Sequence, residues 1–163
     1  MKILVKTQNS KWLPKIIDKG DWVDLCSAEE VKLDAPIAKE GKVTFSKKLI
    51  SLGVAMQLPP GFEAVVVPRS STFSKFKVLL ANSFGVIDNT YCGNNDIWAF
   101  NAIAFDKTVI HKGDRICQFK VQLSQKATWW QKLKWLFDSK VEFVPVDDLQ
   151  NPDRHGFGST GTK

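Results

Sequence analysis

Long apolar runs, paired cysteines and a strong excess of one charge are all missing from this chain of 163 residues. No window approaches the roughly 18 consecutive apolar residues that a membrane-spanning helix requires. The apolar stretch at the N-terminus is too short for a secretory signal peptide, because Lys6 interrupts it. We therefore expect no membrane association and a cytoplasmic protein.

The three cysteines, Cys26, Cys92 and Cys117, lie far apart and form no Cys-x-x-Cys pair. Their spacing argues against a zinc ribbon and a disulfide framework, and it favours a reducing compartment. The net charge of +6 comes from 23 basic and 17 acidic residues. This excess allows an anionic ligand but is too small to indicate nucleic acid, so we expect no direct nucleic-acid binding.

Short β-rich segments, separated by Gly, Pro, Asn and Asp, dominate the first 123 residues. Their spacing predicts an all-β barrel or a jelly-roll-like fold, with one helical turn over Ser71–Phe76. Pro59-Pro60-Gly61 is a strong turn signal. The expected strands are Ile3–Val5, Val43–Phe45, Leu49–Leu58, Phe62–Val67, Phe84–Ile87, Ile97–Phe105, Val109–Ile110 and Arg115–Leu123.

The segment from Thr128 to Lys140 has a helical pattern. Thr128 and Gln131 fit a capping box, so a helix is expected to begin at Trp129. One apolar arc of this helix comprises Trp129, Trp130, Leu133, Leu136 and Phe137. A surface helix that packs this arc on the sheet is the commonest outcome. The alternatives are a docking element that exposes Trp135, which lies outside the arc, and attachment to a membrane surface.

The composition changes after Val146. Residues 147–163 are mostly small and polar, with three glycines, and have little to bury. We therefore expect one β domain over residues 1–146, including the helical segment at about 125–140. A flexible C-terminal arm over residues 147–163 is expected to become ordered on a ligand or partner.

Two segments combine charged and hydroxyl side chains in patterns that suit phosphate chemistry. Asp21 and Asp24 could bind a hard cation such as Mg²⁺, or could be solvated turn acids. Arg69 offers a planar fork of donors, and with Ser70 and Ser71 it could bind phosphate oxygens. A solvated turn is the simpler alternative for this second segment.

Three later segments add a carboxylate, an amide and a glycine-rich tail. Asp88 stands at the end of an apolar strand and can accept a proton from water there, although a turn-forming Asp is the simpler alternative. Gln118 lies on a strand, where a buried amide would need a partner. Residues 154–161 combine an arginine, an aromatic ring and hydroxyls, which could wrap a phosphorylated ring compound or could simply be disordered.

In order and spacing, these five segments resemble the five signature motifs of the trimeric dUTP diphosphatases, or dUTPases. The resemblance covers roughly Ile3–Leu123 and Val141–Lys163. It implies a distorted jelly-roll-like β-barrel that hydrolyses dUTP to dUMP and pyrophosphate with Mg²⁺ and so limits uracil incorporation into DNA. It also implies a homotrimer in which each active site takes residues from all three chains.

The resemblance implies a role for each matched residue. Asp88 would activate the water that attacks the α-phosphorus, Tyr91 would exclude a 2′-hydroxyl, and Asp24 would reach Mg²⁺ through a water. The residues implied in uracil recognition are Asn82, Gly85, Val86 and Ile87. The residues implied in phosphate binding and tail closure are Arg69, Ser70, Ser71, Gln118, Arg154, Phe157, Ser159 and Thr160.

Several positions depart from the usual family motifs and resemble the dUTPases of Gram-positive bacteria and their phages. Ser71 replaces a glycine and Thr90 replaces an aspartate. In that subgroup an aromatic residue after the third motif can cover the uracil, so Trp98 or Phe100 is expected to share this task with Phe157. A phage-encoded protein would act in the host cytoplasm.

Two alternatives to a dUTPase remain. A dCTP deaminase shares the fold and the Arg-Ser-Ser segment, but it needs a catalytic glutamate on the strand after the third motif, and Ile97–Phe105 contains none. A binding protein of the same fold would use the helical segment to bind a regulatory protein partner. An intact Asp88 argues against a purely non-catalytic role.

Overall fold

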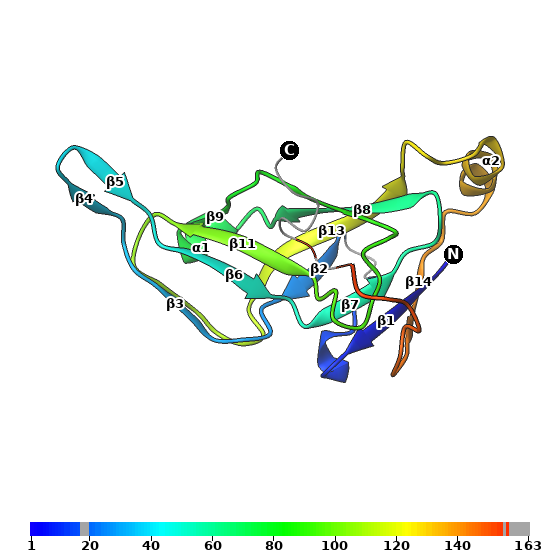
Figure 1. Ribbon diagram of the computed structural model, residues 1–163, viewed down its shortest axis with the longest axis horizontal. Helices are drawn as coiled ribbons and strands as arrows, with labels where there is room; N and C mark the ends of the chain where they lie inside the picture. The colour runs from blue at the N-terminus through cyan, green and yellow to red at the C-terminus, as the bar shows by residue number, and fades with distance from the viewer. Residues whose placement is uncertain (17–19, 155, 157–163) are drawn as a thin grey trace.

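The computed structural model describes residues 1–16, 20–154 and 156. Within these ranges the chain forms fourteen β-strands, two short α-helices and one 3-10 helix (Figure 1). The all-β class predicted from the sequence is confirmed. Neither α-helix is long and apolar enough to cross a membrane. All three cysteines are free.

The elements follow one another along the chain as a series of short strands. Their bounds are β1 (Lys2–Thr7), η1 (Ser10–Trp12), β2 (Val23–Cys26), β3 (Val31–Leu33), β4 (Ile37–Lys39), β5 (Lys42–Thr44), β6 (Lys47–Ser51), β7 (Val54–Gln57), β8 (Phe62–Pro68), α1 (Thr72–Phe76), β9 (Val78–Leu80), β10 (Gly85–Asp88), β11 (Ala99–Ala104), β12 (Thr108–Ile110), β13 (Arg115–Leu123), α2 (Trp129–Phe137) and β14 (Glu142–Pro145).

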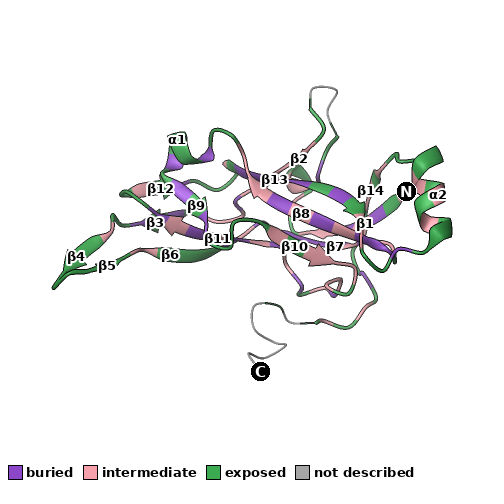
Figure 2. Cartoon of the chain, turned by 90° about the horizontal axis from the view of Figure 1, so that it is seen from above, coloured by how far each residue is buried: buried purple, intermediate pink, exposed green. Residues whose placement is uncertain are grey.

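Strand β8 is central to the sheet that positions the site. This sheet has the order β10-β8-β13-β2, and β8 pairs antiparallel with β10 on one side and β13 on the other. Two three-stranded sheets, β14-β1-β7 and β6-β11-β9, and two two-stranded ribbons complete the described fold. The β4–β5 hairpin and α2 lie at opposite ends of the molecule in both views (Figures 1 and 2).

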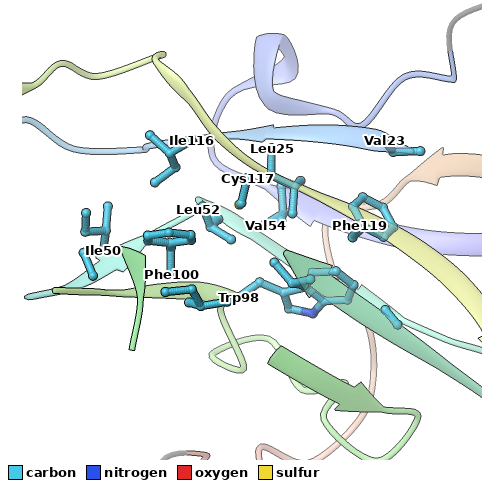
Figure 3. Close-up of a cluster of buried hydrophobic side chains, with 14 of the residues drawn as sticks. Val23, Leu25, Ile50, Leu52, Val54, Trp98, Phe100, Ile116, Cys117 and Phe119 are labelled. Atoms are coloured by element: carbon cyan, nitrogen blue, oxygen red, sulfur yellow. The ribbon is translucent and has the colours of Figure 1, made fainter. Parts of the chain in front are cut away.

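The core lies between these sheets, where the inward residues of each strand meet (Figure 3). Trp98, Phe100 and Phe119 are fully buried there. The rings of Trp98 and Phe119 contact edge to face, with 5.2 Å between their centroids. Along β13 the buried side chains alternate with the exposed Lys120 and Gln122, as a half-buried strand requires.

The single strand expected over Leu49–Leu58 is wrong, because the chain turns at Gly53. Gly53 has φ +68°, a conformation that favours glycine, and a Cβ there would lie 2.7 Å from the Trp12 ring. The turn sends β6 and β7 into different sheets. Five short strands, β2, β3, β4, β9 and β14, were not predicted.

The helix begins at Trp129 with the predicted capping box between Thr128 and Gln131, but its orientation is the reverse of the expected one. Trp135 is half-buried and packs against Phe62, with 5.2 Å between ring centroids. The Gln131 amide donates to the Pro60 carbonyl at 2.7 Å. These two contacts turn the apolar arc toward solvent, so packing of that arc on the sheet and exposure of Trp135 are both wrong.

The first part of the C-terminal arm lies against the rest of the chain. Leu149 is 2% exposed, and its backbone N–H donates to the Asn94 side chain at 3.0 Å. The expectation that this arm has little to bury is therefore wrong for Leu149. Phe157, Ser159 and Thr160 lie outside the described residues, and the domain boundary at residue 146 stays a prediction.

We expect Phe119→Ala to lower the free energy of unfolding by about 3–5 kcal/mol, because it leaves a cavity between Trp98 and Phe143. Phe137→Ala is the matched control, since Phe137 is 81% exposed and should change stability by less than about 0.5 kcal/mol. Urea unfolding followed by far-ultraviolet circular dichroism measures both. Similar losses for the two variants would contradict the assignment of the core.

Candidate functional site

A cavity of about 280 Å³ opens beside the end of β10. It brings together most of the residues matched to the third motif with two from the C-terminal arm. Its lining comprises Val66, Leu80, Asn82, Gly85, Val86, Ile87, Asp88, Tyr91, Trp98, Ala99, Asn101, Arg154 and Gly156. Asn101 was not singled out from the sequence, because an asparagine inside a strand carries no signal of its own.

Asp88 is the carboxylate among the described residues that line the cavity. One oxygen accepts hydrogen bonds from the Thr90 hydroxyl at 2.5 Å and the Thr90 backbone N–H at 2.8 Å. The other oxygen accepts from the Arg154 guanidinium at 2.6 Å. Because each of these contacts is a hydrogen-bond donor to the carboxylate, the arrangement favours its ionised form.

Burial and hydrogen bonding have opposite effects on the pKa of Asp88. Partial desolvation acts to raise the pKa of this carboxyl, but the two bonds from Thr90 and the Arg154 guanidinium together outweigh it and lower the pKa below its ordinary value. The Asp88 side chain is still 43% exposed, so water can reach it. The site therefore presents an ionised and accessible carboxylate.

Tyr91 forms one wall of the cavity. Its hydroxyl donates to the Ile97 carbonyl at 3.1 Å, which fixes the orientation of the ring. Partial burial, with the nearby Asp96 and Asp153, raises the pKa of Tyr91, so the hydroxyl keeps its proton. A Cβ at Gly156 would lie 2.9 Å from the ring, and only glycine fits there without displacement.

Asp96 connects the arm to the site, and it was missed in the sequence. It is 1% exposed, and its carboxylate accepts from the backbone N–H of Gly93 at 2.8 Å and of Arg154 at 2.9 Å. Asn95 also donates to Asp153, at 2.7 and 2.8 Å. These bonds place the Arg154 guanidinium beside Asp88.

The two aromatic residues expected to cover a uracil behave differently. Phe100 is fully buried and does not line the cavity, so that expectation is wrong for Phe100. Trp98 lines the cavity although it is fully buried. Its indole N–H has no hydrogen-bond partner among the described residues, which is unusual for a buried donor. Asn82 lines the cavity and donates to the Phe84 carbonyl at 3.2 Å.

A second polar cluster surrounds Asp24 on β2. Its two oxygens accept from Arg69 at 2.7 Å and from Arg115 at 3.0 Å. Gln118 on β13 lies directly opposite Asp24 in the sheet. Ser70 and Ser71 follow Arg69 and are exposed. Arg115 was not predicted as a site residue.

The cavity with Asp88 and the polar cluster around Asp24 lie at opposite ends of β8. Asp88 pairs with Glu63 near the start of this strand, whereas Arg69 directly follows its end at Pro68. Arg69 follows Glu63 by six positions of extended chain, which corresponds to roughly 20 Å. None of the second group lines the cavity. The sequence-predicted site residues therefore form two separate groups within one chain.

The surroundings of Asp24 leave little room for a direct bond to a metal ion, and its expected contact with Mg²⁺ through a water stays a prediction. Both of its oxygens accept from guanidinium groups, which compete with a cation for the same lone pairs. In the described part of the chain, no group of three or more His, Cys, Asp or Glu residues could hold a metal ion. The cluster is better suited to an anion once Arg69 or Arg115 is released.

Comparison with known proteins defines the class to which this fold and site belong. The dUTPase family profile matches residues 23–134, which is more than half of the chain. The chain belongs to the dUTPase family.

Two curated relatives support this assignment over most of their own lengths. The SPbeta prophage-derived deoxyuridine 5′-triphosphate nucleotidohydrolase of Bacillus subtilis is 48% identical over 147 residues, covering 90% of this chain and 88% of that protein. The deoxyuridine 5′-triphosphate nucleotidohydrolase of a Hydrogenobaculum species is 33% identical, with full coverage of both chains. The relation to a prophage protein agrees with the predicted Gram-positive and phage subgroup.

Solved structures share the fold. The dUTPase of Streptococcus mutans aligns with a TM-score of 0.62 at 23% identity, covering 75% of this chain and 93% of that one. The dUTPase of Staphylococcus bacteriophage 80alpha aligns with a TM-score of 0.60 at 20% identity, covering 77% and 92%. The predicted jelly-roll-like dUTPase fold is therefore confirmed.

We expect Thr90→Val to raise the pKa of Asp88, because the variant loses the hydroxyl bond and keeps the bonds from the backbone N–H of residue 90 and from Arg154. Thr90→Ser retains the hydroxyl and is the matched control. A carboxyl-carbon NMR titration measures both values. A lowered pKa of Asp88 stabilises the native state at neutral pH, and this stabilisation is lost as the pH falls through that pKa. The free energies of unfolding of the two variants should therefore become equal in acid. An unchanged pKa in Thr90→Val would contradict the assignment.

Proposed function

We propose that this protein hydrolyses dUTP to dUMP and pyrophosphate, with Asp88 as the general base. The observation that carries the proposal is the ionised Asp88 carboxylate, fixed by Thr90 and Arg154 at the edge of a cavity of nucleoside size. Such a carboxylate can accept a proton from a water that it orients. The names of the curated relatives support dUTP as the substrate.

The reaction forms one bond to phosphorus and breaks another. A water oxygen deprotonated by Asp88 attacks the α-phosphorus, and the bond between that phosphorus and the bridging oxygen to the β-phosphate breaks. Pyrophosphate then leaves with the electron pair and increased negative charge. Guanidinium groups are suited to this charge, and Arg154 already lies beside the base.

The walls of the cavity suit a pyrimidine deoxynucleoside. Asn82 and the backbone of β10 present amide donors and carbonyl acceptors to a base, and the unpaired Trp98 indole N–H adds a donor. The Tyr91 ring is fixed by its bond to Ile97. A rigid ring in steric contact with the sugar can reject a 2′-hydroxyl, which an apolar pocket alone does poorly.

A second copy of the chain completes the site in this proposal. Asp88 and Arg69 of one chain lie roughly 20 Å apart along β8. In this proposal the Arg69 that binds the phosphates therefore comes from another subunit. The outer face of β6-β11-β9 carries Leu49, Leu79 and Ile103, and the first two are 42% and 40% exposed. Asn101 on that face also lines the cavity. A subunit that covers this face would reach the cavity, which favours a homotrimer with shared sites.

Magnesium, which the family resemblance implies, would have to be held by the triphosphate itself, because guanidinium groups occupy both oxygens of Asp24. A phage phi11 dUTPase of Staphylococcus aureus coordinates a structural Mg(II) ion. We place the activity in the cytoplasm of the cell or host, where dUTP removal limits uracil incorporation into DNA.

Asp88→Asn should keep dUTP binding and lower kcat about 100-fold or more, because the amide cannot accept the proton. Pyrophosphate release from dUTP, dTTP, UTP and dCTP measures this, with the unmodified protein expected to act on dUTP alone. Asp34→Asn is a matched control for the Asp/Asn exchange, since Asp34 is exposed and lies outside the cavity. Near-normal turnover in Asp88→Asn would contradict its role as base. Ammonia released from dCTP would instead favour a deaminase.

Mixed assemblies test the shared site. Arg69→Ala and Asp88→Asn should each be inactive alone, but mixing and reassembling the two chains should restore part of the activity, because some sites then receive an intact Arg69 and an intact Asp88. Asp88→Asn mixed with Tyr91→Ala is the control, since both residues line one cavity of one chain and no intact site can form. Absence of recovery in the first mixture would show that the site does not form between subunits.

A further inference from the structure

The outward face of α2 is the most exposed apolar surface of the described chain that the proposed activity does not use. Trp129, Trp130, Leu136 and Phe137 are 65%, 72%, 77% and 81% exposed. We call these four residues, with the half-exposed Leu133 between them, the α2 apolar face. The helix lies at the end of the molecule away from the β4–β5 hairpin, with no other element in front of it (Figures 1 and 2).

Lysines border this face on both sides. At about 100° per residue, the α2 apolar face spans an arc centred on Leu133, and Lys132 and Lys134 lie just beyond its two edges. Lys126 and Lys140, near the two ends of the helix, are also exposed. Asp138, directly after the helix, is the one acidic residue among positions 125–140. The surroundings of the face are therefore strongly basic.

The helix is already fixed from its opposite side. Trp135 packs on Phe62, Gln131 donates to the Pro60 carbonyl, and Thr128 caps the first turn. Apolar side chains would normally occupy the side that faces the protein, and here the reverse holds for most of them. A ligand that covers the α2 apolar face would thus meet a preformed helix and need not order it.

We propose that α2 binds peripherally to an anionic lipid surface, with the α2 apolar face in the headgroup region. Trp, Phe and Leu on the buried side, with lysines along the edges, is the composition of helices that lie in a membrane interface. Lysine stems extend along the apolar boundary while their ammonium groups reach lipid phosphates. The nine residues of α2 extend only about 13.5 Å, so the helix lies in the surface and does not cross it.

The lysines favour an anionic lipid surface over a second copy of α2 or a groove of another protein. A plane of lipid phosphates meets Lys132 and Lys134 on both edges at once. Two α2 helices packed face to face would place lysines against lysines, which disfavours self-association through this face. A protein groove would need acidic residues along both of its rims. The proposal takes up the membrane-surface alternative that the sequence left open for this helix. It differs from the expectation of no membrane association, which rested on the lack of a long apolar run and of a signal peptide, and it does not depend on the proposed hydrolysis.

Vesicle flotation of the full chain tests the proposal. The protein should float with vesicles of phosphatidylcholine and phosphatidylglycerol in equal parts and remain unbound with phosphatidylcholine alone, and its tryptophan emission should shift to shorter wavelength on binding. Trp130→Ser with Phe137→Ser should abolish flotation. Lys132→Glu with Lys134→Glu should lower the partition coefficient about tenfold or more.

Matched controls use equally exposed residues on the β4–β5 hairpin. Ile37→Ser with Val43→Ser removes exposed apolar groups, and Lys39→Glu with Lys42→Glu reverses the same amount of charge. Both should float like the parent protein. Thermal unfolding and dUTP hydrolysis should be unchanged in every variant, which separates this result from the proposed function.

No flotation, equal flotation with neutral vesicles, or equal losses in the hairpin controls would overturn the proposal. Concentration-dependent self-association that is abolished by Trp130→Ser with Phe137→Ser, without lipid binding, would identify a second copy as the occupant and overturn it as well.

Discussion

The extended length of β8 is the constraint on which the arrangement of the site depends. This strand pairs with β10 at the end that presents Asp88 and leads directly into Arg69 at its other end. An extended strand cannot bring its ends together, so a base at one end and a phosphate-binding arginine at the other cannot act on one small molecule within a single chain. Assembly is then a requirement of the chemistry that we propose. The exposed apolar face beside the cavity is consistent with it.

The C-terminal arm contacts the proposed base through Arg154. Buried Asp96 accepts the backbone N–H of Arg154, and the Arg154 side chain in turn reaches Asp88. These bonds fix the position of the arm so that Arg154 adds to the lowering of the Asp88 pKa. Thr90 adds two donors from the following turn. An arginine that pairs with the base can exchange it for a nucleotide phosphate, because both are oxyanions.

The α2 helix illustrates how a local pattern can be correct while its interpretation is wrong. The capping box and the first residue of the helix follow from Thr128 and Gln131, whose side chains interact only with their own turn. The direction in which the apolar arc points depends on which helix side chain packs against the rest of the protein. Phe62 gives that partner to Trp135, and the larger arc is left in solvent. This reversal makes lipid binding a reasonable role for a surface that would otherwise be core.

Local chemistry in the sequence determined the all-β class, the helical turn that ends at Phe76, the start of α2 and the place of Asp88 at a strand end, because turns, caps and strand ends act over a few residues. The resemblance to the family motifs, and not local chemistry, indicated Tyr91 and Asn82. Only the tertiary structure decided that Gly53 divides one apolar run between two sheets, that Phe100 belongs to the core, and that Asp24 is paired with Arg69 and Arg115. These outcomes depend on contacts between residues far apart in the chain, and no local pattern encodes which of several compatible partners a side chain will meet.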